Sequence, residues 1–463
     1  MMQEQLYFYF TNDFHSNFQQ WPRVAAYLKN ERAKWQSRNR DVYLFDIGDH
    51  IDRVAAITEA TLGKANVGLM NDIGYDAVTL GNNEGITLPH EDLQHLYDHS
   101  KFTVICSNLQ TATGTKPFWL LDRKTIRTRH GTKIGIIGLT APFAAFYKKL
   151  GWEISDPERF LGDEIASLKA EHDILILLSH LGLSEDEKIA QAWPEIDIIM
   201  GGHTHHLLKN GKYVNGVLLT AAGKGCHYAG AVHIEWDLIL NRVTEKSGHA
   251  ENLETYPEDG QTADSLKKLE KDAERKLSVT VAELNYDLKK DWFKKTPLMQ
   301  ALTETMEEWT GADCAMLNSG VILGDLTAGK VTRGDLHRIC PHPINPCVVE
   351  VDGDELLEII RAGETEELTH YELKGFGFRG KVIGKMVLSG IEPIREEKAD
   401  LSFIKSAKIH GEEIDLKGNY KLATADSFTF GRLFPEIAKA REKKYFLPEF
   451  LRDLLLLALQ RLP

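Results

Sequence analysis

The stretch LYFYFTNDFH, residues 6–15, joins an apolar run to a polar turn and sets the pattern for the first half of the chain. Leu6–Phe10 is typical of a strand buried on both faces, and Asp13 and His15 follow where that strand ends. Similar runs are Val42–Phe45, Ala77–Leu80, Ile134–Leu139, Ile174–Leu178 and Ile196–Met200. Helical spacing lies between them over Trp21–Trp35, Ala55–Ile73 and Glu158–Ala170. This alternation predicts an α/β domain with helices packed on a sheet.

The chain has 463 residues, which is more than one hydrophobic core usually holds, so we expect two domains. We predict a first domain over residues 1–250, a charged linker helix over 251–283 and a second domain over 284–463. A surface helix of the first domain is an open alternative for the linker. Strand Cys347–Val351 and helix Leu356–Ala362 make the second domain α+β.

The charge balance narrows the class of partner. With 55 Lys+Arg against 68 Asp+Glu the net charge is −13, and there is no basic stripe that would capture a nucleic acid polymer or an anionic membrane. No run approaches the ~20 apolar residues that span a bilayer, and no signal peptide is recognisable, so we expect a cytoplasmic protein. The oligomeric state stays open.

Polar residues with metal-binding side chains follow five of the predicted strands. They are Asp13 and His15, Asp46 and Asp49, Asn82 with Asn83 and Glu84, His180, and His203 with His205. In α/β sheets the ligand crevice lies at the carboxyl ends of the strands, so we expect these side chains to meet.

The residue types at these strand ends suit a divalent transition metal, because they offer imidazole nitrogen and carboxylate or amide oxygen but no thiolate. Each one alone is more often a cap or a hydrogen-bonded structural group. Gly201 and Gly202 allow a sharp turn that presents His203 and His205 from one loop. Together the residues predict a metal site.

The motifs Asp13-x-His15, Gly48-Asp49, Gly81-Asn82, His180 and Gly-His203-x-His205 resemble the blocks of the calcineurin-like metallophosphoesterases. The second half resembles the substrate-binding domain of the 5′-nucleotidase branch at Asn318-Ser319-Gly320, Gly334-Asp335-Leu336 and Tyr420-Lys-Leu-Ala-Thr. The resemblance implies an N-terminal sheet sandwich flanked by helices and an α+β C-terminal domain of the 5′-nucleotidase type.

The resemblance also implies a dinuclear centre, with Mn²⁺ or Zn²⁺ expected first and Fe or Co as further choices. Asp49 would bridge the two ions; Asp13, His15 and His205 would complete one site, and Asn82, His180 and His203 the other. The implied activity is hydrolysis of nucleotides or related phosphate monoesters by a metal-activated hydroxide. The implied partner is a small-molecule phosphate ester.

The sequence departs from the family pattern beside the metal motif. At the position of Asn83 the family usually has a histidine, which helps to bind phosphate and protonates the leaving group. At the position of Ile86 this branch tends to have an aspartate, the partner of that histidine. Asn83 cannot supply a proton, so we expect slower leaving-group protonation, typically by ~10²–10⁴. Glu84, His50 and His90 are candidate replacement acids, each with a structural role as the alternative.

A second departure lies in the C-terminal half, where Leu323 replaces the arginine that reaches the substrate phosphate in this branch. Arg333 or Arg338 could substitute, beside Asn318 of the Asn318-Ser319-Gly320 motif, although surface or interdomain salt bridges are an alternative for both arginines. Phe376 and Phe428 fall where the branch places two aromatics that sandwich a base. Core packing is an equal alternative for both.

Two other functions stay open at this point. The absent acid and arginine favour a catalytically impaired metal- and nucleotide-binding protein, and the same ligands would also suit a metallohydrolase for a non-phosphate ester. The complete ligand set favours a phosphoesterase, because a protein without use for two metals does not need so many converging ligands.

Overall fold

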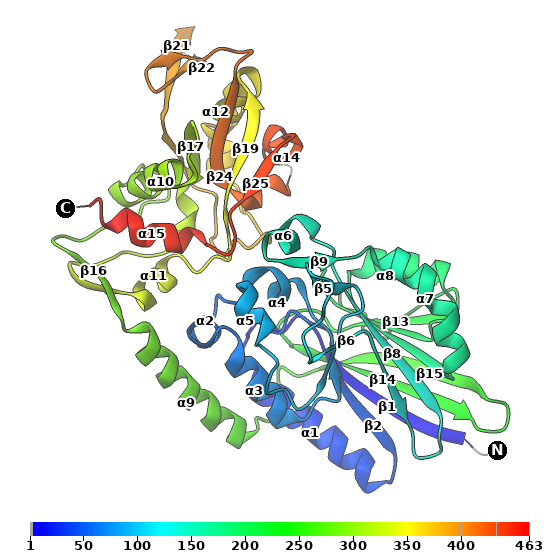
Figure 1. Cartoon of the computed structure of the whole chain (residues 1–463). Helices are drawn as coiled ribbons and strands as arrows, with labels where there is room; N and C mark the ends of the chain where they lie inside the picture. Colours follow the sequence, from blue (N-terminus) through cyan, green and yellow to red (C-terminus); the bar gives the residue numbers. More distant parts are fainter. Residues whose placement is uncertain (1–2, 399–400, 432, 463) are drawn as a thin grey trace. The chain divides into compact units, whose positions relative to one another are not determined.

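The computed structural model describes residues 3–398, 401–431 and 433–462 (Figure 1). The chain forms two compact units, one up to Ala273 and one from Glu274 onward, and helix α9 (Gly260–Leu277) runs across the division. Each unit has its own sheets and its own buried side chains.

Two sheets form the first unit. The seven-stranded sheet has the order β15 (Arg242–Asn252), β14 (Tyr228–Asp237), β1 (Gln3–Thr11), β2 (Asp41–Asp46), β3 (Ala77–Val78), β4 (Thr103–Ile105), β6 (Leu120–Leu121). The six-stranded sheet has the order β12 (Lys212–Val214), β13 (Val217–Ala221), β11 (Ile198–Gly201), β10 (Ile174–His180), β8 (Lys133–Thr140), β7 (Arg123–Arg127). Strands β5 (Leu109–Thr111) and β9 (Trp152–Ile154) pair separately.

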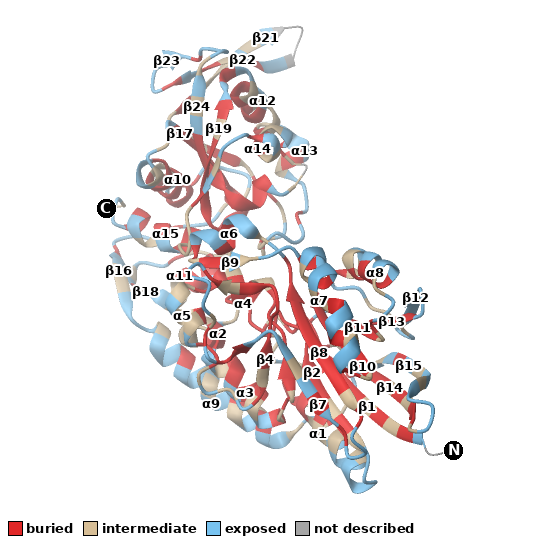
Figure 2. Ribbon diagram, turned by 45° about the vertical axis from the view of Figure 1, so that its right-hand side comes forward, coloured by how far each residue is buried: buried red, intermediate tan, exposed pale blue. Residues whose placement is uncertain are grey.

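The two sheets pack face to face. Phe8 on β1 shares one buried cluster with Ile136 on β8 and Ile176 on β10, and these strands are coloured as buried in Figure 2. The outer face of the six-stranded sheet is covered by helices α7 (Pro157–Glu171) and α8 (Leu183–Ala192), which contribute Leu161 and Ile189 to a second cluster. A sandwich with both faces in apolar contact explains why the central strands read as continuous apolar runs.

The remaining helices of the first unit are α1 (Trp21–Ser37), α2 (Ala56–Thr61), α3 (Lys64–Ile73), α4 (Asn82–Thr87), α5 (His90–Gln94) and α6 (Ala144–Lys149). The prediction of one helix over Ala55–Ile73 was wrong. Leu62 (φ 48°) and Gly63 (φ 84°) adopt left-handed backbone, which ends α2 and lets α3 start in a new direction.

The second unit is built around a five-stranded sheet with the order β20 (Met386–Ser389), β17 (Cys314–Asn318), β24 (Asn419–Ala425), β19 (Pro346–Asp352), β25 (Lys443–Tyr445). A three-stranded sheet joins β21 (Ile391–Lys398), β22 (Leu401–Ile409) and β23 (Glu412–Glu413), and β16 (Thr280–Leu284) pairs with β18 (Gly329–Thr332). Its helices are α10 (Pro297–Thr310), η1 (Ser319–Val321), α11 (Arg333–Ile339), α12 (Gly353–Gly363), α13 (Glu366–Thr369), η2 (Asp426–Thr429), α14 (Pro435–Lys439) and α15 (Leu451–Leu459).

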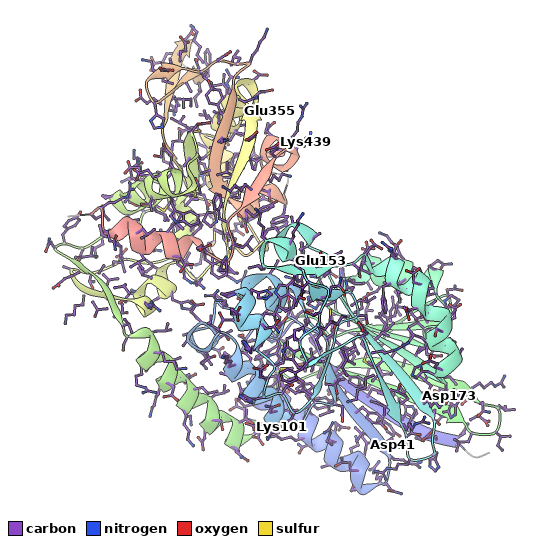
Figure 3. All side chains as sticks on the ribbon, viewed as in Figure 1. Asp41, Lys101, Glu153, Asp173, Glu355 and Lys439 are labelled. Atoms are coloured by element: carbon purple, nitrogen blue, oxygen red, sulfur yellow. The ribbon has the colours of Figure 1, made fainter. Side chains whose placement is uncertain are left out.

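Local sequence explains the start of α12. Asp352 accepts a hydrogen bond from the backbone N–H of Glu355, and the Glu355 carboxylate (Figure 3) accepts one from the N–H of Asp352. This reciprocal pair satisfies two backbone amides that the first helical turn leaves without partners.

The sandwich with flanking helices and the α+β second unit confirm the predicted fold class. Among the helices that the structure describes, none is both long and apolar enough to cross a membrane.

Candidate active site

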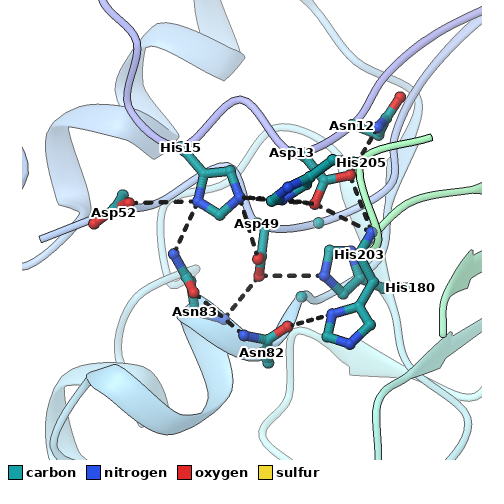
Figure 4. A network of polar contacts seen from close by, with 12 residues as sticks. Asn12, Asp13, His15, Asp49, Asp52, Asn82, Asn83, His180, His203 and His205 are labelled. Atoms are coloured by element: carbon teal, nitrogen blue, oxygen red, sulfur yellow. Dashed lines mark hydrogen bonds and ion pairs between the residues drawn. The ribbon is translucent and has the colours of Figure 1, made fainter. Parts of the chain in front are cut away.

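The seven predicted metal ligands come together at the carboxyl ends of the strands in the first unit (Figure 4). Asp13 and His15 follow β1, Asp49 follows β2, and Asn82 begins the helix after β3. On the other sheet His180 ends β10, while His203 and His205 follow β11. Because β1, β2 and β3 are parallel to one another, as are β8, β10 and β11, each sheet delivers its loops to one edge.

Left-handed backbone occurs at five of these seven residues. Their φ angles are 49° at Asp13, 49° at His15, 51° at Asp49, 72° at His203 and 58° at His205. Non-glycine residues rarely adopt this conformation, and it costs free energy that the surrounding fold must supply. Such residues cluster at functional sites, so the backbone marks this loop cluster independently of its side chains.

Glycines allow the loop after β2 to approach the loop after β3. A Cβ atom on Gly81 would lie 2.1 Å from Asp49 Oδ1 and 2.2 Å from the Asp49 backbone nitrogen. Gly48 has a φ of 87°, and a Cβ there would meet the Gly81 nitrogen at 2.3 Å. These contacts leave no room for a side chain, which explains why a glycine precedes both Asp49 and Asn82.

One group of ligand atoms lies around the Asp13 carboxylate. The Nε2 atoms of His15 and His205 face each other at 3.0 Å, and they lie 3.8 Å and 3.4 Å from Asp13 Oδ1. His15 Nε2 is also 3.6 Å from Asp49 Oδ2. Asp13, His15 and His205 are the residues predicted to complete one metal site beside Asp49, and their ligand atoms all lie within 4.8 Å of one another.

A second group is centred on Asp49 and His180. His180 Nε2 lies 3.3 Å from Asp49 Oδ1, and together with Asp13 these residues form another set within 4.8 Å. The side-chain oxygen of Asn82 lies 2.8 Å from His203 Nδ1, and the rings of His180 and His203 have centroids 5.2 Å apart. The three residues of the second predicted set, Asn82, His180 and His203, are therefore adjacent in space to one another and to Asp49.

Buried opposite charges dominate the electrostatics of this cluster. Burial alone would raise the pKa of Asp49, but the imidazoles of His180 and His15 and the Asn83 backbone N–H together outweigh it and hold the pKa of the carboxyl below its usual range. Burial likewise would lower the pKa of His180, but Asp49 raises it to about 10. For His203 burial prevails, because neighbouring His180 adds to it, and its pKa falls to about 4. The centre is thus an ionised carboxylate pair surrounded by imidazoles.

Glu84 supports the loop that carries Asp49. Its Oε2 accepts hydrogen bonds from the backbone N–H groups of Asp49 (3.0 Å) and Gly81 (2.9 Å), and its Oε1 accepts one from Ile51 (2.9 Å). The Glu84 side chain is buried, and these three hydrogen bonds direct both of its carboxylate oxygens to backbone amides. Its place in the structure is that of a positioning group for Asp49.

Asn83 lies at the edge of the ligand cluster. Its backbone N–H donates to Asp49 Oδ1 at 2.8 Å. Its side-chain Nδ2 donates to the carbonyl of Ile51 at 3.0 Å and lies 3.1 Å from His15 Nδ1. Asn83 thus contacts one carboxylate and one imidazole of the centre and offers no titratable proton.

Two supporting residues were missed by the sequence analysis. The Asp52 carboxylate lies 3.4 Å from His15 Nδ1, on the side of the ring opposite the cluster. Asn12 donates from Nδ2 to Asp13 Oδ2 and to the carbonyl of Gly223, both at 2.7 Å. A carboxylate behind a ligating imidazole fixes the orientation of its ring. The spacing Gly48-Asp49-x-x-Asp52 was the available signal for the first of them.

Three other residues considered from the sequence lie outside the ligand cluster. Asp46 is buried and accepts hydrogen bonds from Thr11 Oγ1 and the backbone N–H of Gly48, which shapes the turn before Asp49. His50 packs against aromatic rings, and burial lowers its pKa to about 3. His90 packs at a tilt against the Trp152 ring, and its Nδ1 lies 2.8 Å from the carbonyl oxygen of Leu150.

The predicted polar contacts of the second unit have local partners. Asn318 is buried and donates to the carbonyl of Ile383 at 3.0 Å. Arg338 is exposed and pairs with Asp335 at 3.2 Å, and Arg333 is an exposed residue at the start of α11. The Arg338–Asp335 pair is a surface salt bridge, which was the predicted alternative to phosphate binding by Arg338.

The two predicted aromatic residues have different environments. Phe376 is 50% exposed at a loop tip with a φ of 52°, between two glycines of positive φ. Phe428 is 1% exposed and packs edge-on against Phe434, so it belongs to the core and cannot stack on a ligand. The ring parallel to Phe376 is Phe430, at a centroid distance of 6.5 Å and an interplanar angle of 3°.

Comparison with known proteins matches each half of the chain to a protein family. The model of the family "Calcineurin-like phosphoesterase" matches residues 6–207, and that of "5'-nucleotidase, C-terminal domain" matches residues 276–432. A relative from Bacillus subtilis, the uncharacterized metallophosphoesterase YunD, is 45% identical over 98% of this chain and 99% of its own length.

More distant matches also extend over most of the chain. A 5'-nucleotidase of Vibrio cholerae is 25% identical, with 77% of this chain and 75% of that protein covered. The solved structure of the NAD nucleotidase of Haemophilus influenzae superposes on the full chain and on 97% of its own, with a TM-score of 0.70 at 17% identity, a likeness of fold. The chain belongs to the calcineurin-like metallophosphoesterases with a 5′-nucleotidase C-terminal domain, hydrolases that act on phosphoric ester bonds and use dinuclear divalent metals.

Proposed function

We propose that the chain hydrolyses nucleotides or related phosphate monoesters at a dinuclear centre held by the seven clustered side chains. Asp49 is the bridging ligand in this proposal. Asp13, His15 and His205 complete one site, and Asn82, His180 and His203 complete the other. The observation that carries the proposal is the convergence of five strand-end loops, from both sheets, on one group of imidazoles and carboxylates.

The side chains fit divalent cations. Among the residues that the structure describes, the buried His180 Nε2 has no hydrogen-bond partner of good geometry, although Asp49 Oδ1 is 3.3 Å away. The Nε2 atoms of His15 and His205 point at each other, an arrangement that a cation between ring nitrogens and carboxylates would stabilise. Nitrogen and oxygen ligands without thiolate suit Mn²⁺ or Zn²⁺, and also Fe or Co.

The charge of the ligand set favours phosphate binding. Two divalent ions bring four positive charges, whereas Asp13 and Asp49 bring two negative ones, so the occupied site attracts an anion. When bound, such an ion pair lowers the pKa of a water toward hydroxide and clamps the oxygens of an in-line displacement. The chain itself orients the ligands: the backbone carbonyl of Ile47 accepts a hydrogen bond from His180 Nδ1, and the Asp52 carboxylate lies against His15 Nδ1.

Protonation of the leaving group is the slow step of the proposed reaction. The Asn83 amide can donate a hydrogen bond to a phosphate oxygen but cannot give up a proton. Glu84 keeps both carboxylate oxygens on backbone amides, away from a departing alcohol. Esters with acidic leaving groups, such as p-nitrophenyl phosphate, need no such proton and are expected to react faster than nucleoside monophosphates.

The nucleotide part of the proposal is supported by the exposed aromatic rings of the second unit. Phe376 and Phe430 are parallel, and both are partly exposed. Flat faces of this kind stack on any purine or pyrimidine, with about 1–3 kcal/mol per base. Phe430 takes the place that the sequence analysis gave to Phe428.

A phosphate-release screen tests the proposal. Purified protein would be assayed with Mn²⁺, Zn²⁺ or Co²⁺ on nucleoside monophosphates, sugar phosphates and p-nitrophenyl phosphate. We expect Asp49→Asn to abolish turnover, and Asp163→Asn, an exposed position on α7, to leave it unchanged. Full turnover in Asp49→Asn, or none in the wild type with any of these metals, would overturn the assignment of this centre.

A further inference from the structure

Three of the seven candidate ligands leave the six-stranded sheet, and one helix lies beside the loops that carry them. His180 ends β10, while His203 and His205 follow β11 (Figure 4). Helix α8 begins three residues after His180 and packs on β11. Its first turn is therefore close to both loops.

The carboxyl of Asp186, near the start of α8, connects the two strand ends. It is buried, and one of its oxygens accepts a hydrogen bond from the hydroxyl of Ser179, the residue before His180. The other oxygen faces β11, since a Cβ on Gly201 would lie 2.4 Å from Oδ2. Ser179 and Gly201 are direct partners in the β10–β11 ladder. A single side chain thus contacts both strands where their ligand loops begin.

Backbone contacts leave little space for these loops to shift. The N–H of Gly202 donates to the carbonyl of Ser179 at 2.9 Å. A Cβ on Gly202 would lie 3.0 Å from His180 Nδ1, so the two loops approach each other closely at this imidazole. A displacement of either strand end is therefore passed on to the imidazoles of His180 and His203, because closely packed groups transmit strain.

The N-terminus of α8 is capped from the loop after β11. Gly182 precedes the helix and has no side chain that could accept a hydrogen bond from it. The hydroxyl of Thr204 accepts one instead, from the backbone N–H of Leu183 at 3.1 Å. Thr204 lies between His203 and His205 in the sequence. The cap therefore joins the loop with two candidate ligands to α8.

The ionisation of Asp186 decides which substitution conserves its contacts. Burial raises the pKa of the carboxyl to about 8, although the Ser179 hydroxyl and the His180 imidazole lower it. The carboxyl is thus mostly protonated near pH 7. An asparagine at this position has nearly the same shape, is also neutral and keeps an oxygen for the Ser179 hydroxyl. An alanine keeps neither the shape nor the oxygen.

We propose that Asp186 and Thr204 are positioning residues of the metal centre, which hold the imidazole loops of the six-stranded sheet against α8 and so set the affinity for the ions. The inference rests on the dinuclear centre of the proposed function. Asp186 is in neither of the two candidate ligand groups of the described chain, so its effect is indirect. It acts on His180 and His203, which are assigned to the same ion, and should affect that ion more than the other.

Metal titration of Asp186 variants tests this selectivity. Equilibrium dialysis against Mn²⁺ with elemental analysis would give the number of bound ions and their dissociation constants. In Asp186→Ala one ion should bind about 10–100-fold more weakly, the usual effect of removing a group behind a ligand, and the other should change by less than about threefold. Asp186→Asn should bind both ions nearly as the wild type does. Asp237→Ala is the control, because this carboxylate bonds to the β14–β15 turn, at the opposite end of β1 from Asp13.

A second pair of variants tests the cap. Thr204→Val removes the hydroxyl at nearly constant shape and should weaken the binding of both ions by about three- to tenfold, the size of effect that the loss of a helix cap has on stability. Both ions are affected because His203 and His205 are assigned to different ones. Thr204→Ser keeps the hydroxyl and should bind as the wild type does. Thr365→Val is the matched control, since Thr365 is also an exposed helix cap, on α13 in the second unit.

The outcomes separate this inference from the centre itself. Unchanged dissociation constants in Asp186→Ala, or both ions weakened equally, would overturn the positioning role of Asp186. Should this variant not fold, Ser179→Ala deletes the donor of the same hydrogen bond and should weaken the same ion selectively. Equal affinities in Thr204→Val and Thr204→Ser would overturn the role of Thr204. A wild type that binds fewer than two Mn²⁺ would instead overturn the proposed centre.

Discussion

Asn83 occupies the position where the family resemblance predicts an acidic histidine, and the structure shows its side chain bonded to Ile51 and adjacent to His15. At the scale of single residues, this asparagine is the main chemical difference between the chain and the family pattern. The ligand atoms around Asp13 and Asp49 lie within reach of one another, whereas the Asn83 amide itself has no titratable proton to give. The two observations predict an enzyme whose turnover rate is limited by protonation of the leaving group.

Replacing Asn83 by histidine tests that limit. Asn83→His should raise the turnover of nucleoside monophosphates by at least about tenfold, because general acid catalysis contributes typically ~10²–10⁴. The rate with p-nitrophenyl phosphate should change much less. Steady-state kinetics on both esters measure the difference, with Asn83→Ala as the control that removes the same contacts and adds no acid. An equal gain on both substrates would refute the explanation.

Glu84 gives a second prediction at this scale. Glu84→Gln leaves one acceptor oxygen for three backbone N–H groups, so the free energy of unfolding should fall by about 1–3 kcal/mol. Metal affinity should fall about 10–100-fold, because the loop holding Asp49 loses its support. Denaturation and metal titration would measure both, with Glu153→Gln at an exposed position (Figure 3) as the control. Unchanged metal affinity would show that Glu84 does not position Asp49.

The loops that end the strands are the elements on which the site depends. The loop after β2 and the loop after β3 approach so closely that Gly81 has no space for a methyl group. Gly81→Ala should therefore displace Asp49 and remove most of the activity. Gly162→Ala is the matched control, because a Cβ at this position on α7 meets nothing within 4 Å. Activity assays and circular dichroism would check both, and a fully active Gly81→Ala protein would contradict the contact.

The sequence predicted the strands and the ligand-bearing loops because their apolar runs and polar ends are local signals. It did not predict the break between α2 and α3, since Leu62 is an unusual residue for left-handed backbone. Nor did it identify Asn12 or Phe430, whose roles depend on contacts with chain segments distant in sequence. Phe428 and Phe430 differ by two positions, and only packing shows which ring is exposed.

At the scale of the whole molecule, a buried carboxyl makes the stability of the second unit depend on pH. Asp426 in the second unit is buried, and burial raises its pKa to about 8, against an ordinary value near ~3.9 in an unfolded chain. Between these two values the folded unit binds more protons than the unfolded chain, so this group lowers stability as the pH rises from about 4 to about 8.

Replacing this carboxyl isolates its effect. The free energy of opening in Asp426→Asn, relative to the wild type, should increase from pH 4 to pH 8 by at most a few kcal/mol and then level off. Hydrogen exchange of β19 and β24 at a series of pH values would measure it. Asp354→Asn, at an exposed position, is the control. A difference that does not vary with pH would contradict the buried, protonated carboxyl.

Metal content tests the central claim most directly, because the proposed function requires that loops from both sheets hold a pair of ions. Elemental analysis of the wild type after equilibration with Mn²⁺ or Zn²⁺ should give about two divalent ions per chain. The folded Asp49→Asn variant should lose most of that metal, since it lacks the shared ligand. A wild type that binds no divalent ion, or an Asp49→Asn variant that keeps both, would contradict the account.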